Sequence, residues 1–168
     1  SKEGIKKGMN VIAGSGLVGI VTDVGPNFAK VRSIIDDSSN VSSMVLTTKD
    51  NFNVGGSLKS MNQDKVLPFT ELRDEDDKVK VGDPVVTSYV SDQYQEGILI
   101  GYIASIEKNA NNLTKSGTIT PVVDFQHLRE VLVITTLKDT GEKELSSQKA
   151  SDTQTETQDN TETQKSQD

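Results

Sequence analysis

The sequence predicts an all-β protein: two small β-barrels of the six-stranded type in a trypsin-like arrangement, followed by a disordered tail. Three observations predict it: a sequence motif that occurs twice, short β-branched runs separated by turn residues, and a C-terminal segment almost without apolar residues. Short strands at near-regular spacing are typical of sandwiches and barrels. A motif repeated at this distance indicates two copies of one structural unit.

The repeated motif begins with an apolar residue, a lysine, any residue and a glycine, and it ends in a strand. The first copy occupies residues 5–21 and the second occupies residues 79–103. Its glycines have a predicted backbone role, because glycine permits strand entry, bulges and tight corners. These structural glycines are Gly8, Gly16, Gly19, Gly82, Gly97 and Gly101.

The remaining elements follow in chain order. Residues 17–24 and 30–35 flank a Gly-Pro-Asn cluster and have the signature of a hairpin. Further expected strands lie at 45–48, 57–61, 66–69, 84–90, 98–106, 117–123 and 131–137. Residues 124–131 fit two helical turns with Asp124 as N-cap.

Domain boundaries follow from the repeat and from composition. We assign residues 1–71 to the first barrel and 72–138 to the second, with the charged run 73–78 as the joint; exchange of strands between the barrels would move this boundary. Residues 139–168 hold Leu145 and Ala150 as their apolar side chains, with eight acids and three lysines. Such a segment cannot bury enough apolar surface to offset the entropy of ordering it, so we expect this acidic tail to be disordered.

Charge and composition exclude several classes of partner. The net charge is −7, most of it in the tail, and no basic stripe is present to neutralise the phosphates of a nucleic acid. The sequence lacks cysteine, which excludes disulfides and thiolate metal sites. It also lacks a transmembrane run and a signal peptide, and we interpret the chain as a fragment of a longer protein.

Motifs typical of enzymes occur without their required context. Residues 14–19 match the dinucleotide fingerprint, but β-branched residues follow where a helix would be needed. A serine-lysine motif at 105–108 lies in a β run, and the acidic run 74–77 lacks the later ligands of a calcium loop. A serine-protease triad would depend on His127, the single histidine, and no nucleophile turn is present. We therefore predict no catalytic residue, cofactor or metal site.

Aromatic side chains are the remaining candidates for a functional surface. Phe52, Tyr89 and Tyr94 fall in predicted loops or at strand edges, where tyrosine is often an interface anchor. Partial burial against a barrel end is the alternative for each. We name the three as candidate interaction residues.

The ordered series of motifs resembles the extracytoplasmic core of the MreC family of rod shape-determining proteins. The resemblance covers residues 4 to about 137 and rests on residues 5–12, 16–21, 24–26, Val31, Asp36, 79–88, 97–98, Gly101, Pro121, Asp124, Leu128 and 131–133. The chain departs from the family pattern at Tyr89, at residues 94–97 and at His127. The composition of the tail suits a member from a Gram-positive coccus such as a streptococcus.

The resemblance implies a non-catalytic scaffold of the cell-elongation machinery, which organises or activates peripheral peptidoglycan synthesis. It implies contacts with a class B penicillin-binding transpeptidase, RodA and MreD, and self-association of the full-length protein through a coiled coil. It also implies anchoring at the extracytoplasmic face of the membrane by an N-terminal helix outside this chain. Two alternatives stay open: a serine hydrolase on a double β-barrel, and a secreted wall-binding module.

Overall fold

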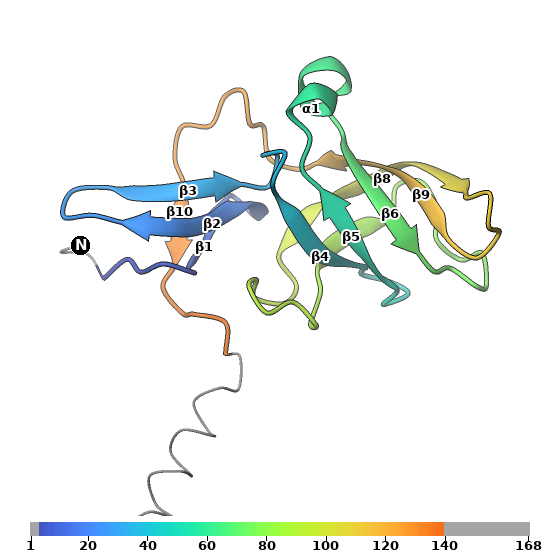
Figure 1. Ribbon diagram of the computed structural model, residues 1–168, viewed down its shortest axis with the longest axis horizontal. Coiled ribbons are helices and arrows are strands. Elements are labelled where there is room, and N and C mark those ends of the chain that lie inside the picture. The colour runs from blue at the N-terminus through green and yellow to red at the C-terminus, as the bar shows by residue number, and fades with distance from the viewer. Residues whose placement is uncertain (1–3, 140–168) are drawn as a thin grey trace, which may run out of the picture. The chain divides into compact units, whose positions relative to one another are not determined.

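Ten strands and one short helix make up the chain in the computed structural model, which describes residues 4–139 (Figure 1). The all-β prediction is confirmed. The elements are β1 (Asn10–Ala13), β2 (Gly16–Val24), β3 (Ala29–Ser33), β4 (Asn40–Val45), β5 (Asn51–Gly55), α1 (Leu58–Asp64), β6 (Leu67–Leu72), β7 (Pro84–Thr87), β8 (Leu99–Lys108), β9 (Lys115–Pro121) and β10 (Leu132–Ile134).

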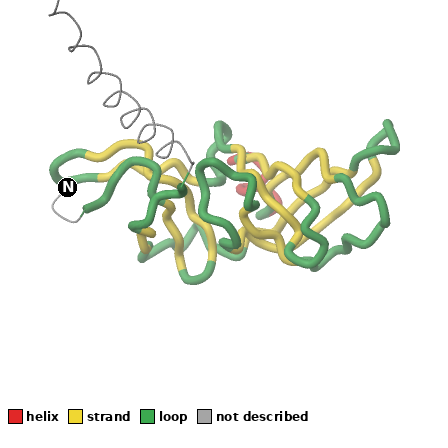
Figure 2. Tube along the Cα trace, turned by 90° about the horizontal axis from the view of Figure 1, so that it is seen from below, coloured by secondary structure: helices red, strands yellow, loops and turns green. Residues whose placement is uncertain are grey.

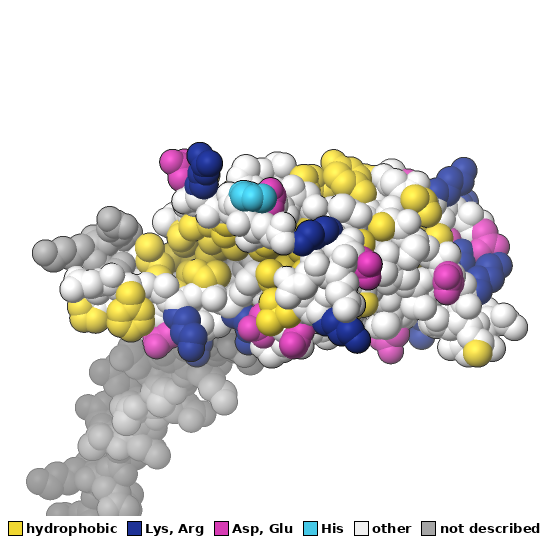
Figure 3. All heavy atoms as spheres, turned by 90° about the horizontal axis from the view of Figure 1, so that it is seen from above, with side chains coloured by type: hydrophobic (Ala, Val, Ile, Leu, Met, Phe, Trp, Pro, Cys, Tyr) yellow, Lys and Arg dark blue, Asp and Glu magenta, His cyan; other side chains and the backbone are white. Residues whose placement is uncertain are grey.

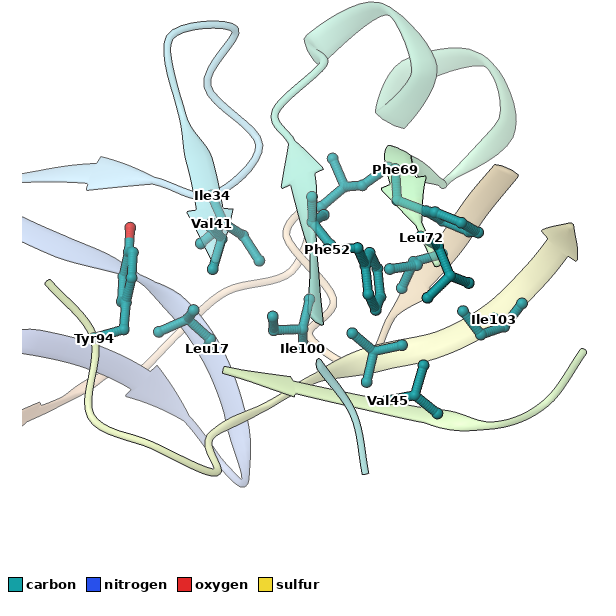
Figure 4. Close-up of a cluster of buried hydrophobic side chains, with 14 of the residues drawn as sticks. Leu17, Ile34, Val41, Val45, Phe52, Phe69, Leu72, Tyr94, Ile100 and Ile103 are labelled. Carbon is teal, nitrogen blue, oxygen red and sulfur yellow. The ribbon is translucent and has the colours of Figure 1, made fainter. Parts of the chain in front are cut away.

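Six of the strands close into a barrel. Each pairs antiparallel with its neighbours in the order β4, β5, β6, β9, β8 and β7, and β7 pairs back to β4. The barrel interior holds large apolar side chains (Figure 4), among them Val45, Phe69, Leu72 and Ile103, all at most 2% exposed. Closure satisfies the backbone groups of both sheet edges, so this barrel has no free edge strand.

The other four strands form a sheet in the order β10, β1, β2, β3. One parallel pair, Gly16 with Leu99, connects this sheet to β8 of the barrel. A small second core of Met9, Val11, Val18, Val21 and Val123 covers one face of the sheet. In the described part of the chain this unit therefore has four strands, and it differs from the second six-stranded barrel that the sequence predicted.

The strand pairing crosses the predicted boundary at residues 71 and 72. Strands β4, β5 and β6 precede that boundary and β7, β8 and β9 follow it, yet all six belong to one barrel. The four-stranded sheet likewise combines β1–β3 with β10 from the end of the described chain. The boundary does not separate the two sheets, because strands are exchanged between the two halves of the sequence.

The repeated motif builds the same backbone geometry twice. Gly8 and Gly82 have φ angles of +90° and +93°, a conformation that side chains with a Cβ rarely adopt. The amide of Gly8 donates to the Val21 carbonyl at 2.8 Å, and the amide of Gly82 donates to the Ile103 carbonyl at 2.7 Å. Strands β1 and β2 are therefore the structural counterparts of β7 and β8.

A second pair of glycines lies where neighbouring strands approach closely. A Cβ added at Gly19 would lie 2.1 Å from the Arg32 carbonyl oxygen, and one added at Gly101 would lie 2.1 Å from the Thr120 carbonyl oxygen. Since Arg32 lies on β3 and Thr120 on β9, these two strands are counterparts as well. The repeat thus extends over three strands in each copy.

Three local predictions were wrong, and strands β4 and β5 were largely missed. Residues 45–48, expected as a strand, contain only the last residue of β4 and then a turn. Residues 57–61, expected as a strand, enter helix α1, because the Ser57 side chain caps it by accepting from the Ser60 amide at 3.1 Å. Figure 2 shows this helix in red among strands and loops. Residues 124–131, expected as two helical turns, form only a turn, a bend and irregular backbone, although Asp124 accepts from the Gln126 amide as a cap would. Of the predicted disordered tail, residues 140–168 lie outside the described residues.

Candidate interaction surface

The loop between β7 and β8 distinguishes the two copies of the repeat. In the first copy residues 14–15 connect the two strands, whereas in the second copy residues 88–98 make the connection. This longer loop presents Tyr89 and Val90 to solvent, at 53% and 59% exposure. An aromatic ring and an aliphatic side chain exposed side by side are typical of protein contact surfaces.

Partly buried hydrogen bonds from Asn10 hold this loop against the four-stranded sheet. Asn10 of β1 is 1% exposed, and its side-chain amide donates to the Gln93 carbonyl at 3.0 Å and accepts from the Gln95 amide at 2.7 Å. Inside the loop, Thr87 Oγ1 donates to the Gln95 carbonyl and accepts from the Ile98 amide at 2.8 Å. The loop is consequently fixed at its centre and at its ends.

A polar contact with β5 holds Tyr89 from the barrel side. The Ser88 hydroxyl donates to the side-chain oxygen of Asn51, and the Asn51 side-chain nitrogen donates to the Tyr89 hydroxyl at 3.4 Å. Tyr89 therefore remains about half exposed while its hydroxyl accepts a hydrogen bond from Asn51. A restrained aromatic side chain loses little conformational entropy when a partner covers it.

The structure corrects two of the three predicted interaction residues. Phe52 is 5% exposed and packs edge-on against Phe69 inside the barrel, with ring centroids 5.1 Å apart. Tyr94 is 2% exposed and packs in the same core near Leu17 (Figure 4), and this burial raises the pKa of its hydroxyl. Both belong to the core, and Tyr89 is the predicted residue that lies on the surface.

A nearly buried ion pair holds the β6–β7 connection against β9. Lys115 Nζ lies 2.6 Å from Asp74 Oδ2, with side-chain exposures of 10% and 1%, and it also contacts the exposed Asp77. Burial raises the pKa of Asp74, but the Lys115 ammonium and the amides of Lys78 and Val79 outweigh it and hold that pKa below its ordinary value. The Asp74 carboxylate is therefore already occupied by protein groups.

Two polar hollows flank this ion pair, with volumes of about 480 and 310 Å³. Their linings are charged, hydroxyl and amide side chains with Leu113 as the one large apolar residue. Within residues 4–139 no group of three or more His, Cys, Asp or Glu side chains is arranged to hold a metal ion. Nothing about these hollows assigns them a ligand.

His127 and Asp124 form a pair like two members of a catalytic triad, with Nδ1 2.8 Å from Oδ2. Both side chains are exposed, at 76% and 66%, and the contact spans one turn of the chain. The His127 imidazole, and then the backbone amides of Gln126 and His127 that donate to the Asp124 carboxylate, hold the pKa of Asp124 below its ordinary value. The pair is explained as a local turn that stabilises the β9–β10 connection.

Apolar side chains gather on the surface beside this turn (Figure 3), where hydrophobic spheres lie next to the histidine. The β9–β10 connection and the start of β10 expose Val122, Leu128, Val131 and Leu132 by 40% to 65%. From the sequence, only aromatic side chains were named as surface candidates, so these aliphatic residues were not included.

Comparison with known proteins shows the family of the chain. The family model "Rod shape-determining protein MreC, barrel core" matches residues 1–135. The chain belongs to the MreC family. The cell shape-determining protein MreC of Listeria monocytogenes is 32% identical over 136 residues, which are 80% of this chain and 45% of that protein. This chain thus spans about half the length of its Listeria relative.

Solved MreC structures share the fold. The Listeria monocytogenes structure superposes with a TM-score of 0.69 and 31% identity, covering 83% of this chain and 67% of that one. A complex between penicillin-binding protein PBP2 and MreC from Helicobacter pylori contains a chain with a TM-score of 0.57 and 17% identity, with 74% of each chain covered. A further structure, described as the major periplasmic domain of the cell shape-determining filament MreC, has a TM-score of 0.60 and 21% identity, with 77% of each covered.

These MreC relatives are named for cell shape, and their names include no enzymatic activity. Among residues 4–139 no helix is long and apolar enough to span a membrane.

Proposed function

We propose that this MreC chain is a non-catalytic scaffold that binds a class B penicillin-binding transpeptidase and so organises peripheral peptidoglycan synthesis. One observation carries the proposal: a protein of the same fold and family forms a complex with PBP2. In this view the MreC chain supplies a rigid surface and the bound enzyme supplies the chemistry. Contacts with RodA and MreD, and self-association through a coiled coil, belong to the same proposal for the full-length protein.

The β7–β8 loop supports a contact role. Tyr89 combines a large exposed ring with a tethered hydroxyl, and tyrosine is enriched among the residues that dominate binding energies. The loop is held by Asn10 and Asn51, which lie on different sheets. We therefore propose Tyr89 as an anchor residue of the transpeptidase interface.

The proposed location is the extracytoplasmic face of the membrane, where peptidoglycan is assembled. The periplasmic domain described for a relative of the same fold supports this location.

Biolayer interferometry with the immobilised extracytoplasmic region of the cognate transpeptidase tests the proposal. We expect saturable binding that Tyr89→Ala weakens at least about tenfold, in the range of an interface hot spot. Tyr102→Ala is the matched control, since Tyr102 is a tyrosine on β8 with 43% exposure, and it should leave the affinity unchanged. Absence of binding by a folded chain, or equal losses in the two variants, would contradict the proposal.

A further inference from the structure

Strand β3 has one paired edge and one free edge. It pairs antiparallel with β2, and within the described chain no other strand pairs with it. The Ile34 amide, just after β3, donates to the Val18 carbonyl on β2, so alternate residues along the strand turn their backbone groups toward β2. By this alternation Ala29 and Val31 direct their backbone N–H and C=O groups away from β2. Ser33 follows the same alternation, but its carbonyl already accepts from the Asp36 amide at 3.1 Å.

The closed barrel contains a strand equivalent to β3 that is paired along both of its edges. Strand β9 is the counterpart of β3, since the Val122 amide donates to the Ile100 carbonyl on β8 as the Ile34 amide does to Val18 on β2. The second edge of β9 is covered by β6. The four-stranded sheet has counterparts of β7, β8, β9 and β4 in β1, β2, β3 and β10, and it lacks counterparts of β5 and β6.

The pairing of β6 with β9 shows which kinds of side chain an added strand would place opposite β3. Leu67 of β6 lies opposite Ile119, the counterpart of Val31, and Phe69 lies opposite Gly117, the counterpart of Ala29. Apolar side chains at these two positions fill the closed barrel, where Leu67 and Phe69 are 0% and 1% exposed.

The apolar surface next to β3 is only partly covered. Val31 lies opposite Val21, a member of the small second core, yet Val31 remains 38% exposed and Phe28 remains 59% exposed. Leu128 and Val131 in the β9–β10 connection are 40% and 44% exposed. Hydrophobic side chains accordingly appear at the surface beside the histidine in Figure 3.

From these features we infer that β3 accepts an extended strand of a partner protein along its free edge, antiparallel to β3, as β6 lies against β9. Such β-strand addition draws affinity from main-chain hydrogen bonds and specificity from alternate side chains. The incoming strand places apolar side chains opposite Ala29 and Val31, which continue the second core. This docking site is separate from Tyr89 and does not depend on the proposed transpeptidase contact.

The charged side chains of β3 indicate which side chains the incoming strand carries on the face opposite its apolar one. Lys30 and Arg32 alternate with Ala29 and Val31, so they lie on the opposite face of the sheet. Antiparallel pairing of two copies of β3 about Val31 would place Lys30 opposite Arg32 of the second copy, and like charges directly opposite are destabilising. The partner strand that fits therefore alternates apolar with acidic side chains. The acidic tail of this chain lacks that alternation, because residues 140–168 contain only Leu145 and Ala150 as apolar residues.

Fluorescence anisotropy with a labelled synthetic peptide that alternates valine and glutamate tests this site. The chain should bind this peptide at least about tenfold more tightly than a peptide that alternates valine and lysine. Val31→Pro removes an amide that faces the free edge and should weaken binding at least about tenfold, equivalent to about 1.4 kcal/mol. Val31→Ala keeps the amide and serves as the control, with a smaller loss.

A second measurement keeps the test independent of how Val31→Pro folds. N-methylation of the peptide on the edge that faces β3 should abolish binding, whereas N-methylation on its other edge should leave binding intact. Hydrogen exchange of the Val31 amide should slow when the unmodified peptide is added. Three results would each overturn the inference: no saturable binding at ~1 mM peptide, equal effects of the two N-methylation patterns, or protection of Val31 by dimerisation of the chain alone.

Discussion

The close contacts that Gly19 and Gly101 make with the backbone of the neighbouring strand allow the effect of an added methyl group on stability to be predicted. Gly101 lies on β8 and is paired with Pro121 on β9. An added Cβ would lie 2.1 Å from the Thr120 carbonyl oxygen and 2.9 Å from the Pro121 Cα, both backbone atoms that cannot rotate away. Even a tight Cβ contact needs 3.0 Å, so Gly101→Ala must move β9 by about 1 Å.

The expected cost follows from that displacement. Overpacking a close-packed interior costs about 1–3 kcal/mol and occasionally more, and here the moving element is a paired strand of a closed barrel. We expect Gly101→Ala to lower the free energy of unfolding by about 3 kcal/mol, or the midpoint of thermal unfolding by roughly 10 °C. Gly19→Ala should behave alike, because its added Cβ would meet the Arg32 carbonyl oxygen at the same distance.

Thermal unfolding followed by circular dichroism measures both variants. Gly97→Ala is the matched control: its φ is +82°, but no atom outside its neighbours lies within 4 Å of the added Cβ. This control should lose only about 1 kcal/mol from backbone strain. If Gly101→Ala proved as stable as Gly97→Ala, the close contact between Gly101 of β8 and the backbone of β9 would be refuted.

Four further outcomes are expected. Lys115→Met, which leaves the Asp74 carboxylate buried without its cation, should cost about 3 kcal/mol in chemical denaturation. Folding lowers the pKa of Asp74, so the stabilisation by its carboxylate is present above the ordinary pKa of 3.8 and is lost as pH falls through the native pKa. The free energy of unfolding should therefore fall less steeply on acidification in Asp74→Asn. An unchanged dependence of stability on pH would contradict this. Phe52→Ala should cost about 3–5 kcal/mol, whereas Tyr89→Ala should change stability by less than about 0.5 kcal/mol, and similar losses would refute the assignment of Phe52 to the core. Asn10→Ala should cost about 2 kcal/mol and speed amide exchange at Gln95, while unaltered exchange would show that Asn10 does not hold the loop.

The fold was predictable from sequence where the signal is local. The glycines Gly8 and Gly82 before strands and the hairpin of β2 with β3 were predicted from glycines, β-branched runs and a Gly-Pro-Asn turn. Helix α1 was missed, because its apolar residues fit a strand and its start depends on one capping serine. Strand order was beyond local signals, since the pairing of β6 with β9 joins residues on either side of the predicted boundary.

The candidate surface was predictable only in part. Tyr89 was named correctly as a surface aromatic, but Phe52 and Tyr94 were placed at the surface because they are near turn residues in sequence. Their burial depends on residues far away in the chain, such as Phe69 for Phe52. The free edge of β3 was also invisible to sequence reasoning, because it is recognised only by comparison with the paired edge of β9.

The proposed direct contact between this MreC chain and a penicillin-binding enzyme is tested most directly by site-specific photocrosslinking. A benzophenone amino acid would replace Tyr89 in cells that carry the full-length protein, with Tyr102 as the control position. We predict a covalent adduct from position 89 that also carries a fluorescent penicillin label, and none from position 102. Adducts that lack the penicillin label, or no adduct from position 89 in a folded protein, would contradict the account.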